Sequence, residues 1–139
     1  MLDPQKTTVR DAEEVAPAKK ITGNSYSALS VVPYFPFALK RVFILEATIS
    51  KVLRGSHAHK NCAQAFILQK GDFQIEIFDS IESRLLNSNP NTIYLVPPGI
   101  WVNITLDSNS NVVVLCDQLY DEHDYMRDWD SFSSWKRLE

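Results

Sequence analysis

Phe73-Gln74-Ile75-Glu76-Ile77-Phe78-Asp79 alternates apolar and polar side chains almost without a break. Successive side chains of a β-strand point to opposite faces, so this pattern predicts an antiparallel strand with one face in a core and the other in water. Lys70-Gly71-Asp72, immediately before it, is typical of a tight turn, and the run 63–69 before that turn is again apolar. These segments predict two strands joined by a turn.

Similar short runs continue on both sides of this pair. Further strands are expected at 42–47, 92–96, 101–106 and 112–115. Loops are expected by composition at 87–91, 97–99 and 107–111. Many short strands with this spacing indicate an all-β sandwich or barrel. Only the end of the chain has a helical pattern, because Tyr125, Trp129 and Phe132 follow at i, i+4 and i+7.

Length and composition favour a single soluble domain. The chain has 139 residues, of which 45% are hydrophobic and 22% charged. Residues 1–23 are mostly polar, and we expect them to form a mobile or late-docking arm outside the core. Residues 24–139 would then form one domain, including the helical segment at the C-terminus.

Charge and hydropathy exclude several functions and predict the compartment. A formal net charge of −3 argues against a nucleic-acid partner. No apolar run reaches the ~20 residues of a membrane span, so no membrane partner is expected. Residues 1–20 lack the apolar segment of a signal peptide, and the two cysteines, Cys62 and Cys116, are expected to be reduced thiols. We therefore predict a cytoplasmic protein.

The segment Arg54-Gly55-Ser56-His57-Ala58-His59-Lys60 holds two of the three histidines of the chain. On an extended strand, His57 and His59 would leave the same face and converge, while Ala58 would point the other way. Such a pair provides either part of a metal site or an acid/base pair. The third histidine, His123, is distant in sequence.

The spacing around this pair is similar to that of the cupins. Cupins carry a glutamate a few residues after His-x-His, then a glycine, and a second motif, Pro-x-Gly-x-x-His. Here Gln64 stands at the glutamate position, Gly71 at the glycine position, and Pro97-Pro98-Gly99-Ile100-Trp101-Val102 aligns with the second motif. The resemblance implies a cupin jelly-roll barrel, here with a short C-terminal helix.

The cupin metal site is incomplete in this sequence. Gln64 replaces the glutamate and Val102 replaces the last histidine, which leaves two ligands where three are the usual minimum for a catalytic site. Cys62 lies three residues after His59 and could add a thiolate. We expect no metal and no other cofactor. Acid/base chemistry by histidines of pKa ~6.5 is the favoured reading, and a bound metal or a purely structural pair are the alternatives.

Four motifs in order narrow the resemblance. They are Phe35-Pro36-Phe37-Ala38-Leu39-Lys40-Arg41-Val42-Phe43, the histidine segment 54–60, the proline turn 97–101 and Tyr120-Asp121-Glu122-His123-Asp124-Tyr125-Met126-Arg127-Asp128. From about residue 23 to 132 the chain resembles the FdtA/QdtA (WxcM-like) sugar 3,4-ketoisomerases. The resemblance implies a cytoplasmic homodimer that converts dTDP-4-keto-6-deoxyglucose into its 3-keto isomer. That product is a precursor of 3-amino sugars in surface glycans.

The resemblance also implies roles for individual residues. His59 would be the base that removes the C3 proton, and His57 its partner or proton shuttle. Arg41 would contact the enediolate or the diphosphate, since a guanidinium binds such oxygens through paired hydrogen bonds. The other residues implied to bind substrate are Arg54, Lys60, Gln64, Trp101 and Tyr120.

Some positions depart from the family pattern. Residues 22–26 lack an arginine that many members carry, Phe43 replaces a common tyrosine, and Val102 replaces a polar residue. In the family, the first and last of these places help to choose the face of C4 that receives the proton. A second hypothesis is therefore a catalytically weakened cupin that binds a nucleotide sugar or supports a partner enzyme. A metal-dependent cupin enzyme is the third.

Overall fold

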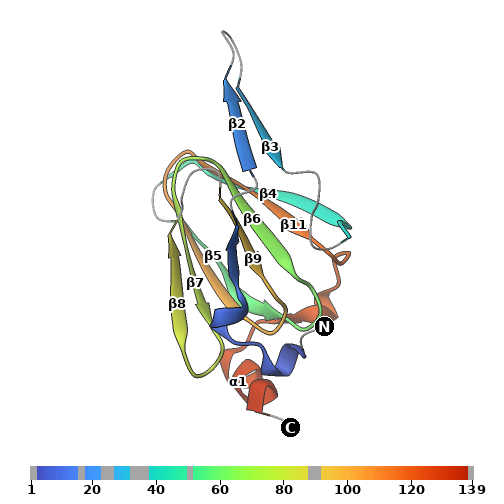
Figure 1. Cartoon of the computed structure of the whole chain (residues 1–139). Coiled ribbons are helices and arrows are strands. Elements are labelled where there is room, and N and C mark those ends of the chain that lie inside the picture. Colours follow the sequence, from blue (N-terminus) through green and yellow to red (C-terminus); the bar gives the residue numbers. More distant parts are fainter. Residues whose placement is uncertain are drawn as a thin grey trace.

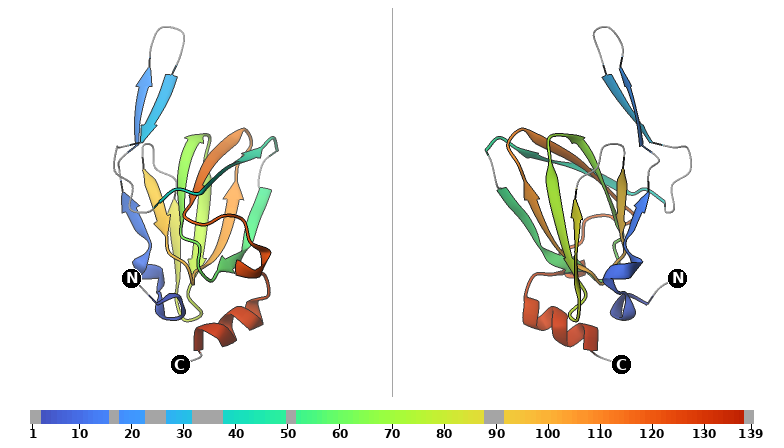
Figure 2. Two further views of the ribbon diagram at one scale, coloured as in Figure 1. Left: turned by 90° about the vertical axis from the view of Figure 1, so that its right-hand side faces the viewer. Right: turned by 60° about the vertical axis from the view of Figure 1, so that its left-hand side comes forward.

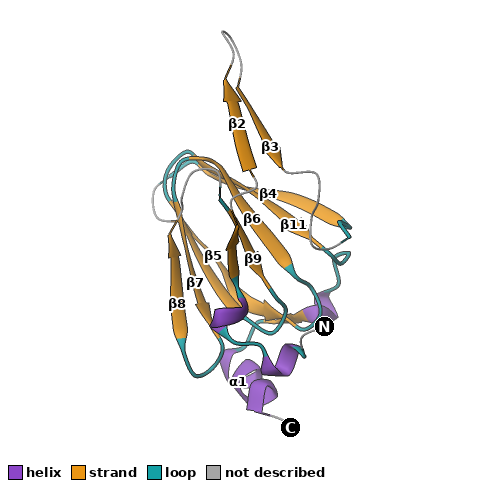
Figure 3. Ribbon diagram, viewed as in Figure 1, coloured by secondary structure: helices purple, strands orange, loops and turns teal. Residues whose placement is uncertain are grey.

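Two five-stranded antiparallel sheets pack face to face and form a β-barrel, with a short helix below one end (Figures 1 and 2). The computed structural model describes residues 3–15, 18–22, 27–31, 38–49, 52–87 and 92–137. Figure 3 shows how strands dominate this part of the chain. The structure confirms the all-β class and the short C-terminal helix.

Each sheet is built from strands that are distant in sequence. The first has the order β1 (Glu13–Val15), β9 (Ile93–Val96), β6 (Gln64–Lys70), β11 (Ser110–Cys116), β4 (Arg41–Ala47). The second has the order β12 (Tyr125–Met126), β5 (Val52–His59), β10 (Trp101–Leu106), β7 (Phe73–Phe78), β8 (Ser83–Asn87). A separate hairpin of β2 (Ala18–Thr22) and β3 (Ser27–Val31) extends away from the barrel (Figure 1).

The strands expected from alternation are confirmed to within about two residues. In β7, Phe73, Ile75 and Ile77 are buried in the core, whereas Gln74 and Glu76 are exposed. The turn before β7 is also confirmed: Gly71 has a φ of +84°, and a Cβ on it would collide with Ser110. The strands β2, β3 and β8 were not predicted, and most of the expected loop 87–91 lies outside the described residues.

The predicted helical stripe is wrong at its first member. Tyr125 belongs to β12 and pairs with His59, while helix α1 spans Trp129–Arg137. Asp128 explains the boundary, because its carboxylate accepts hydrogen bonds from the backbone N–H and the hydroxyl of Ser131, each at 2.9 Å. Such a cap begins a helix, so Tyr125 is free to enter the barrel.

Of the expected arm 1–23, residues 3–15 dock onto the barrel and contribute to its core, whereas β2 extends away from it. Val9 and Ala12 are each 3% exposed, and β1 adds an edge strand beside β9. The described part also includes two 3-10 turns, Pro4–Lys6 and Val9–Asp11, the second closed by a capping box between Thr8 and Asp11. The polar composition of the segment did not predict this docking, because it depends on two small buried side chains, Val9 and Ala12, and on a few polar contacts.

Lys136 of α1 is the main polar anchor of this segment. Its Nζ donates to the carbonyl oxygens of Pro4 and Thr7 and to the Thr7 hydroxyl, at 3.1, 2.5 and 3.1 Å. Lys136→Met should lower the free energy of unfolding by about 1–3 kcal/mol, since it leaves buried acceptors unpaired. Thermal and urea denaturation measure this. Lys70→Met, at an exposed lysine, is the control, and an equal effect of both changes would contradict the anchor role.

The described residues contain no helix that is long and apolar enough to cross a membrane. The interior of the barrel is filled by side chains of the β-strands, and Tyr94 and Phe66 are the largest of those that are fully buried.

Candidate active site

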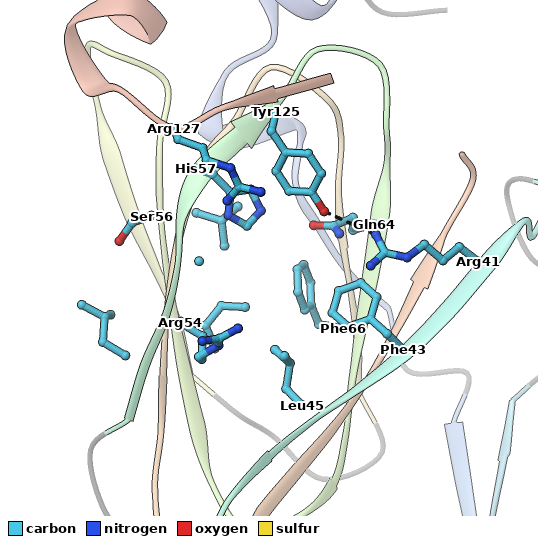
Figure 4. Close-up of a pocket in the computed structure, with 14 residues that line it drawn as sticks. Arg41, Phe43, Leu45, Arg54, Ser56, His57, Gln64, Phe66, Tyr125 and Arg127 are labelled. Atoms are coloured by element: carbon cyan, nitrogen blue, oxygen red, sulfur yellow. Dashed lines mark hydrogen bonds between the residues drawn. The ribbon is translucent and has the colours of Figure 1, made fainter. Parts of the chain in front are cut away.

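A cavity of about 430 Å³ opens between the two sheets (Figure 4). Strands β4 and β6 form one wall, and β5, β10 and β12 form the other. The lining residues are Arg41, Phe43, Leu45, Leu53, Arg54, Gly55, Ser56, His57, Gln64, Phe66, Val102, Ile104, Tyr125 and Arg127. The barrel therefore places several of the residues singled out in the sequence around one space.

A β-bulge orients the histidine segment. The pairing of β5 with β10 shifts between Val102, which faces His57, and Asn103, which faces Gly55. Gly55 and Ser56 both have positive φ, +92° and +59°. A Cβ on Gly55 would lie 2.7 Å from the carbonyl oxygen of Val102, so only glycine fits there. Bulges of this kind redirect the side chains that follow, here His57.

His57 and His59 converge as their spacing predicts. Their ring centroids lie 5.0 Å apart at 87°, an edge-to-face contact. His57 lines the cavity, whereas His59 is only 6% exposed and lies behind it. Burial and the neighbouring His59 lower the pKa of His57 to about 4. A neutral imidazole, able to accept a proton, therefore faces the cavity at neutral pH.

His59 forms a dyad with Asp124. Its Nδ1 lies 2.8 Å from Oδ2 of Asp124, and the other carboxylate oxygen accepts the backbone N–H of Asn61 at 2.6 Å. Burial lowers the pKa of His59, although the hydrogen bond and the charge of Asp124 act against this. A neutral His59 donates from Nδ1, and its Nε2 is buried without a partner in the described part of the chain.

Tyr125 lies over both histidines. Its ring centroid is 4.9 Å from that of His57 and 4.3 Å from that of His59. The Tyr125 hydroxyl points into the cavity and accepts a hydrogen bond from Arg41 at 3.3 Å (Figure 4). The Tyr125 ring thus contacts the cavity-facing imidazole, while its hydroxyl extends to the Arg41 guanidinium.

Three guanidinium groups surround the cavity. Arg41 is held by Tyr125, and Arg127 forms a two-point ion pair with Glu122 at 2.7 and 2.9 Å. The side chain of Arg54 makes no ion pair or hydrogen bond with another described residue. The cavity is therefore positively charged on several sides, and Arg54 is available to an anionic ligand.

The rest of the cavity wall is apolar. Phe43, Leu45 and Phe66 extend from the first sheet, and Val102 and Ile104 from the second. The cavity therefore has a polar part around His57 and Tyr125 and an apolar part away from it.

Other expected site residues lie elsewhere. Trp101 was expected to bind substrate, but it does not line the cavity. It is 6% exposed and packs against Trp129 and Phe132, on the face of β10 turned away from the cavity. Val102 takes the inward position because side chains alternate along the strand. Lys60 does not line the cavity.

Two further expected residues lie close to the site. Gln64 lines the cavity, and its amide donates to the Cys116 thiol at 3.5 Å. Tyr120 is 57% exposed at the edge of a second hollow of about 560 Å³, where it bonds Glu122 at 2.6 Å. The region 23–26, with its departures from the family pattern, lies outside the described residues.

The residues do not fit a cupin metal centre. Val102 has no donor atom at the last ligand position, and the Gln64 amide is turned to Cys116. A different set of ligand-type atoms, from His59, Cys62 and Asp124, does lie within 4.8 Å.

Sequence reasoning missed three participants. Asp124 is the partner of His59, Tyr125 the lid over both rings, and Arg127 a lining residue. All belong to the motif 120–128, in which the sequence analysis gave Tyr125 only a place in a helical stripe and gave Asp124 and Arg127 no role. No local signal shows that a segment 65 residues after His59 returns to it.

The fold and the cavity define a class of protein: an antiparallel barrel with a histidine pair and a tyrosine in an anion-attracting interior. Residues 13–137 match the family model FdtA, described as WxcM-like, C-terminal. The chain belongs to this family.

Comparisons with individual proteins agree. The chain is 30% identical over 102 residues to a TDP-4-oxo-6-deoxy-alpha-D-glucose-3,4-oxoisomerase of Aneurinibacillus thermoaerophilus, over 72% of this chain and 73% of that protein. A 3,4-ketoisomerase from Helicobacter canadensis has a TM-score of 0.81 at 24% identity, with 92% of this chain and 98% of that chain covered.

A variant of the 3,4-ketoisomerase QdtA from Thermoanaerobacterium thermosaccharolyticum, in complex with TDP-4-keto-6-deoxyglucose, has a TM-score of 0.79 at 22% identity and covers 91% and 94% of the two chains. These two structures share the fold of this chain and confirm the expected cupin barrel.

Proposed function

We propose that this protein is a 3,4-ketoisomerase of a dTDP-linked 4-keto-6-deoxyhexose, acting in the formation of dTDP-3-amino sugars for surface glycans. The observation that carries the proposal is a neutral His57, in ring contact with Tyr125, in a cavity that three arginines line. Family membership and the activities named for the relatives support it. Conversion of dTDP-4-keto-6-deoxyglucose to a 3-keto product, followed by NMR, tests it.

The reaction removes one proton from C3, delivers one to C4, and transfers one from the C3 oxygen to the C4 oxygen. The ketone at C4 acidifies the C3–H bond, so a base can remove that proton and leave an enediolate. A proton must then reach C4, while the C3 hydroxyl loses its proton and O4 gains one. No electron is lost or gained overall.

We propose that His57 removes the C3 proton and delivers a proton to C4. The resemblance implied this role for His59, with His57 as its partner. His57 faces the cavity, whereas Nδ1 of His59 is engaged by Asp124. His59 is then a positioning residue that packs against His57 and Tyr125.

We propose that Tyr125 transfers the proton between the C3 and C4 oxygens. Its hydroxyl can donate its proton to O4 and then take the proton of O3, and Arg41 stabilises the negatively charged phenolate oxygen between the two transfers. The apolar wall around Phe43, Leu45 and Phe66 suits the methyl group of a 6-deoxy sugar.

Arg54 is proposed to bind the diphosphate. Because it has no partner among the described residues, ligand binding breaks no existing ion pair. Arg54→Gln should raise KM about 10- to 100-fold and leave kcat nearly unchanged, the loss expected for a hydrogen bond to a charged group. Steady-state kinetics measure both values. Arg10→Gln, at a surface ion pair with Glu82, is the control, and an unchanged KM for Arg54→Gln would contradict the role.

A homodimer is proposed through the outer face of the first sheet. Val42 and Ile44 of β4 are 52% and 54% exposed, and they pair in register with the outward-facing Leu115 and Val113 of β11. Exposed apolar groups that adjoin one another on a sheet mark an interaction surface.

Ile44→Lys should therefore convert the dimer to a monomer, as sedimentation or light scattering would show. Leu85→Lys changes an equally exposed residue, at 51%, on β8 of the other sheet, and should leave the dimer intact. A wild-type monomer, or an Ile44→Lys dimer, would contradict this surface.

We also propose a cytoplasmic location. Cys62 and Cys116 are both free and buried, the state expected of thiols in a reducing compartment.

A further inference from the structure

A group of buried ligand-type side chains lies directly behind the cavity. His59, Cys62 and Asp124 are 6%, 5% and 8% exposed, and one donor atom of each lies within 4.8 Å of the others. We call these three residues the buried triad. His59 packs against the cavity-lining His57, so the triad adjoins the site without lining it.

A second thiol stands next to the triad. The Cys116 side chain lies close enough to Cys62 to raise the pKa of the Cys62 thiol. Cys116 is fully buried and also accepts the amide of Gln64, a lining residue, at 3.5 Å. A second buried thiol therefore lies beside the three ligand-type groups of the triad.

The chemistry of this set favours a thiophilic divalent cation. Zinc binds cysteine, histidine and carboxylate groups tetrahedrally at ~2.0–2.3 Å, which places neighbouring ligand atoms roughly 3.3–3.8 Å apart. The triad needs shifts on the order of 1 Å to reach that geometry, within the range of small side-chain rotations. Nε2 of His59 is buried and has no hydrogen-bond partner among the described residues, so the imidazole is incompletely satisfied.

We propose that His59, Cys62 and Asp124 form a binding site for Zn²⁺. Binding at Nδ1 of His59 moves its proton to the unpartnered Nε2, and the Cys62 thiol releases its proton to solvent. The site differs from the cupin metal position, because it uses neither Gln64 nor Val102.

Zinc at this site inhibits the enzyme, a consequence that rests on the proposed function. The cation replaces the hydrogen bond between His59 and Asp124, which measures 2.8 Å. It also brings positive charge next to His57 and so opposes formation of an imidazolium there. The thiol of Cys62 takes no part in the isomerisation.

Metal binding itself is tested with Cd²⁺, which gives an ultraviolet charge-transfer band when bound by thiolate. Titration of the metal-free full chain should produce this band with one Cd²⁺ bound per chain, and Zn²⁺ should displace it. Cys62→Ala should weaken binding at least about tenfold. His123→Asn, at an exposed histidine–carboxylate pair, should bind as the wild type does.

Measurement of isomerase activity with and without Zn²⁺ is the second part of the test. Metal-free Cys62→Ala should retain wild-type turnover but resist Zn²⁺, whereas Zn²⁺ should inhibit the wild type reversibly by chelation. Wild-type protein that gives no Cd²⁺ band, or Cys62→Ala that binds as tightly as wild type, overturns the site whatever the activity. A normal band in a protein without isomerase activity would instead overturn the proposed function and leave the site standing.

Discussion

His57→Asn should reduce the rate of ketone transfer by about 10³-fold or more, because general base catalysis contributes about 10²- to 10⁴-fold and no other described imidazole faces the cavity. Asparagine keeps a polar side chain of similar size but cannot accept the C3 proton. Binding of the dTDP sugar should change little, since the arginines that attract the anion remain. Stopped assays by NMR measure the rate, and calorimetry measures the binding.

The matched control is His123→Asn. The His123 side chain is fully solvent-exposed and, among the described residues, is paired with Asp121 alone, so its loss should not change the rate. His59→Asn adds a second comparison, because it removes the dyad with Asp124 but leaves the cavity-facing base. If His59→Asn abolished activity while His57→Asn kept it, the order of the two histidines would have to be exchanged.

Tyr125→Phe should lower kcat about 10²-fold with KM nearly unchanged, the effect of removing one general acid/base group. Phenylalanine keeps the ring contacts with His57 and His59, at 4.9 and 4.3 Å, and deletes only the hydroxyl bonded to Arg41. Exchange of the C3 proton with solvent should persist, because His57 still forms the enediolate. Formation of the 3-keto product should be slow.

Tyr120→Phe provides the comparison for this change. The Tyr120 hydroxyl bonds Glu122 at 2.6 Å outside the cavity, so its removal should leave kcat near the wild-type value. A Tyr125→Phe protein with wild-type turnover would remove the hydroxyl from the mechanism. If Tyr125→Phe reduced C3 proton exchange and product formation equally, the hydroxyl would instead act in the removal of the C3 proton.

Strand alternation made much of the barrel predictable, and the same rule brought His57 and His59 onto one face. Alternation could not predict which of these two histidines lines the cavity. That depends on the bulge at Gly55 and Ser56 and on the return of residues 124–125 beside His59. Both are long-range features, set by pairing between distant strands.

Two errors have local explanations. Trp101 was expected in the site because of its motif, but alternation along β10 turns it outward to Phe132 and brings Val102 inward. The N-terminal segment was expected to lie outside the core, because its composition is polar. Its docking depends on Val9 and on the contacts of Lys136, which composition does not reveal.

The central claim is that this cavity moves a ketone from C4 to C3 by proton transfer. Incubation of the untagged protein with dTDP-4-keto-6-deoxyglucose in deuterated water, followed by NMR, tests it most directly. The account predicts a 3-keto product that carries deuterium at C4, and loss of both signals in His57→Asn. Substrate that binds but yields neither the 3-keto product nor deuterium at C3 or C4 would contradict it.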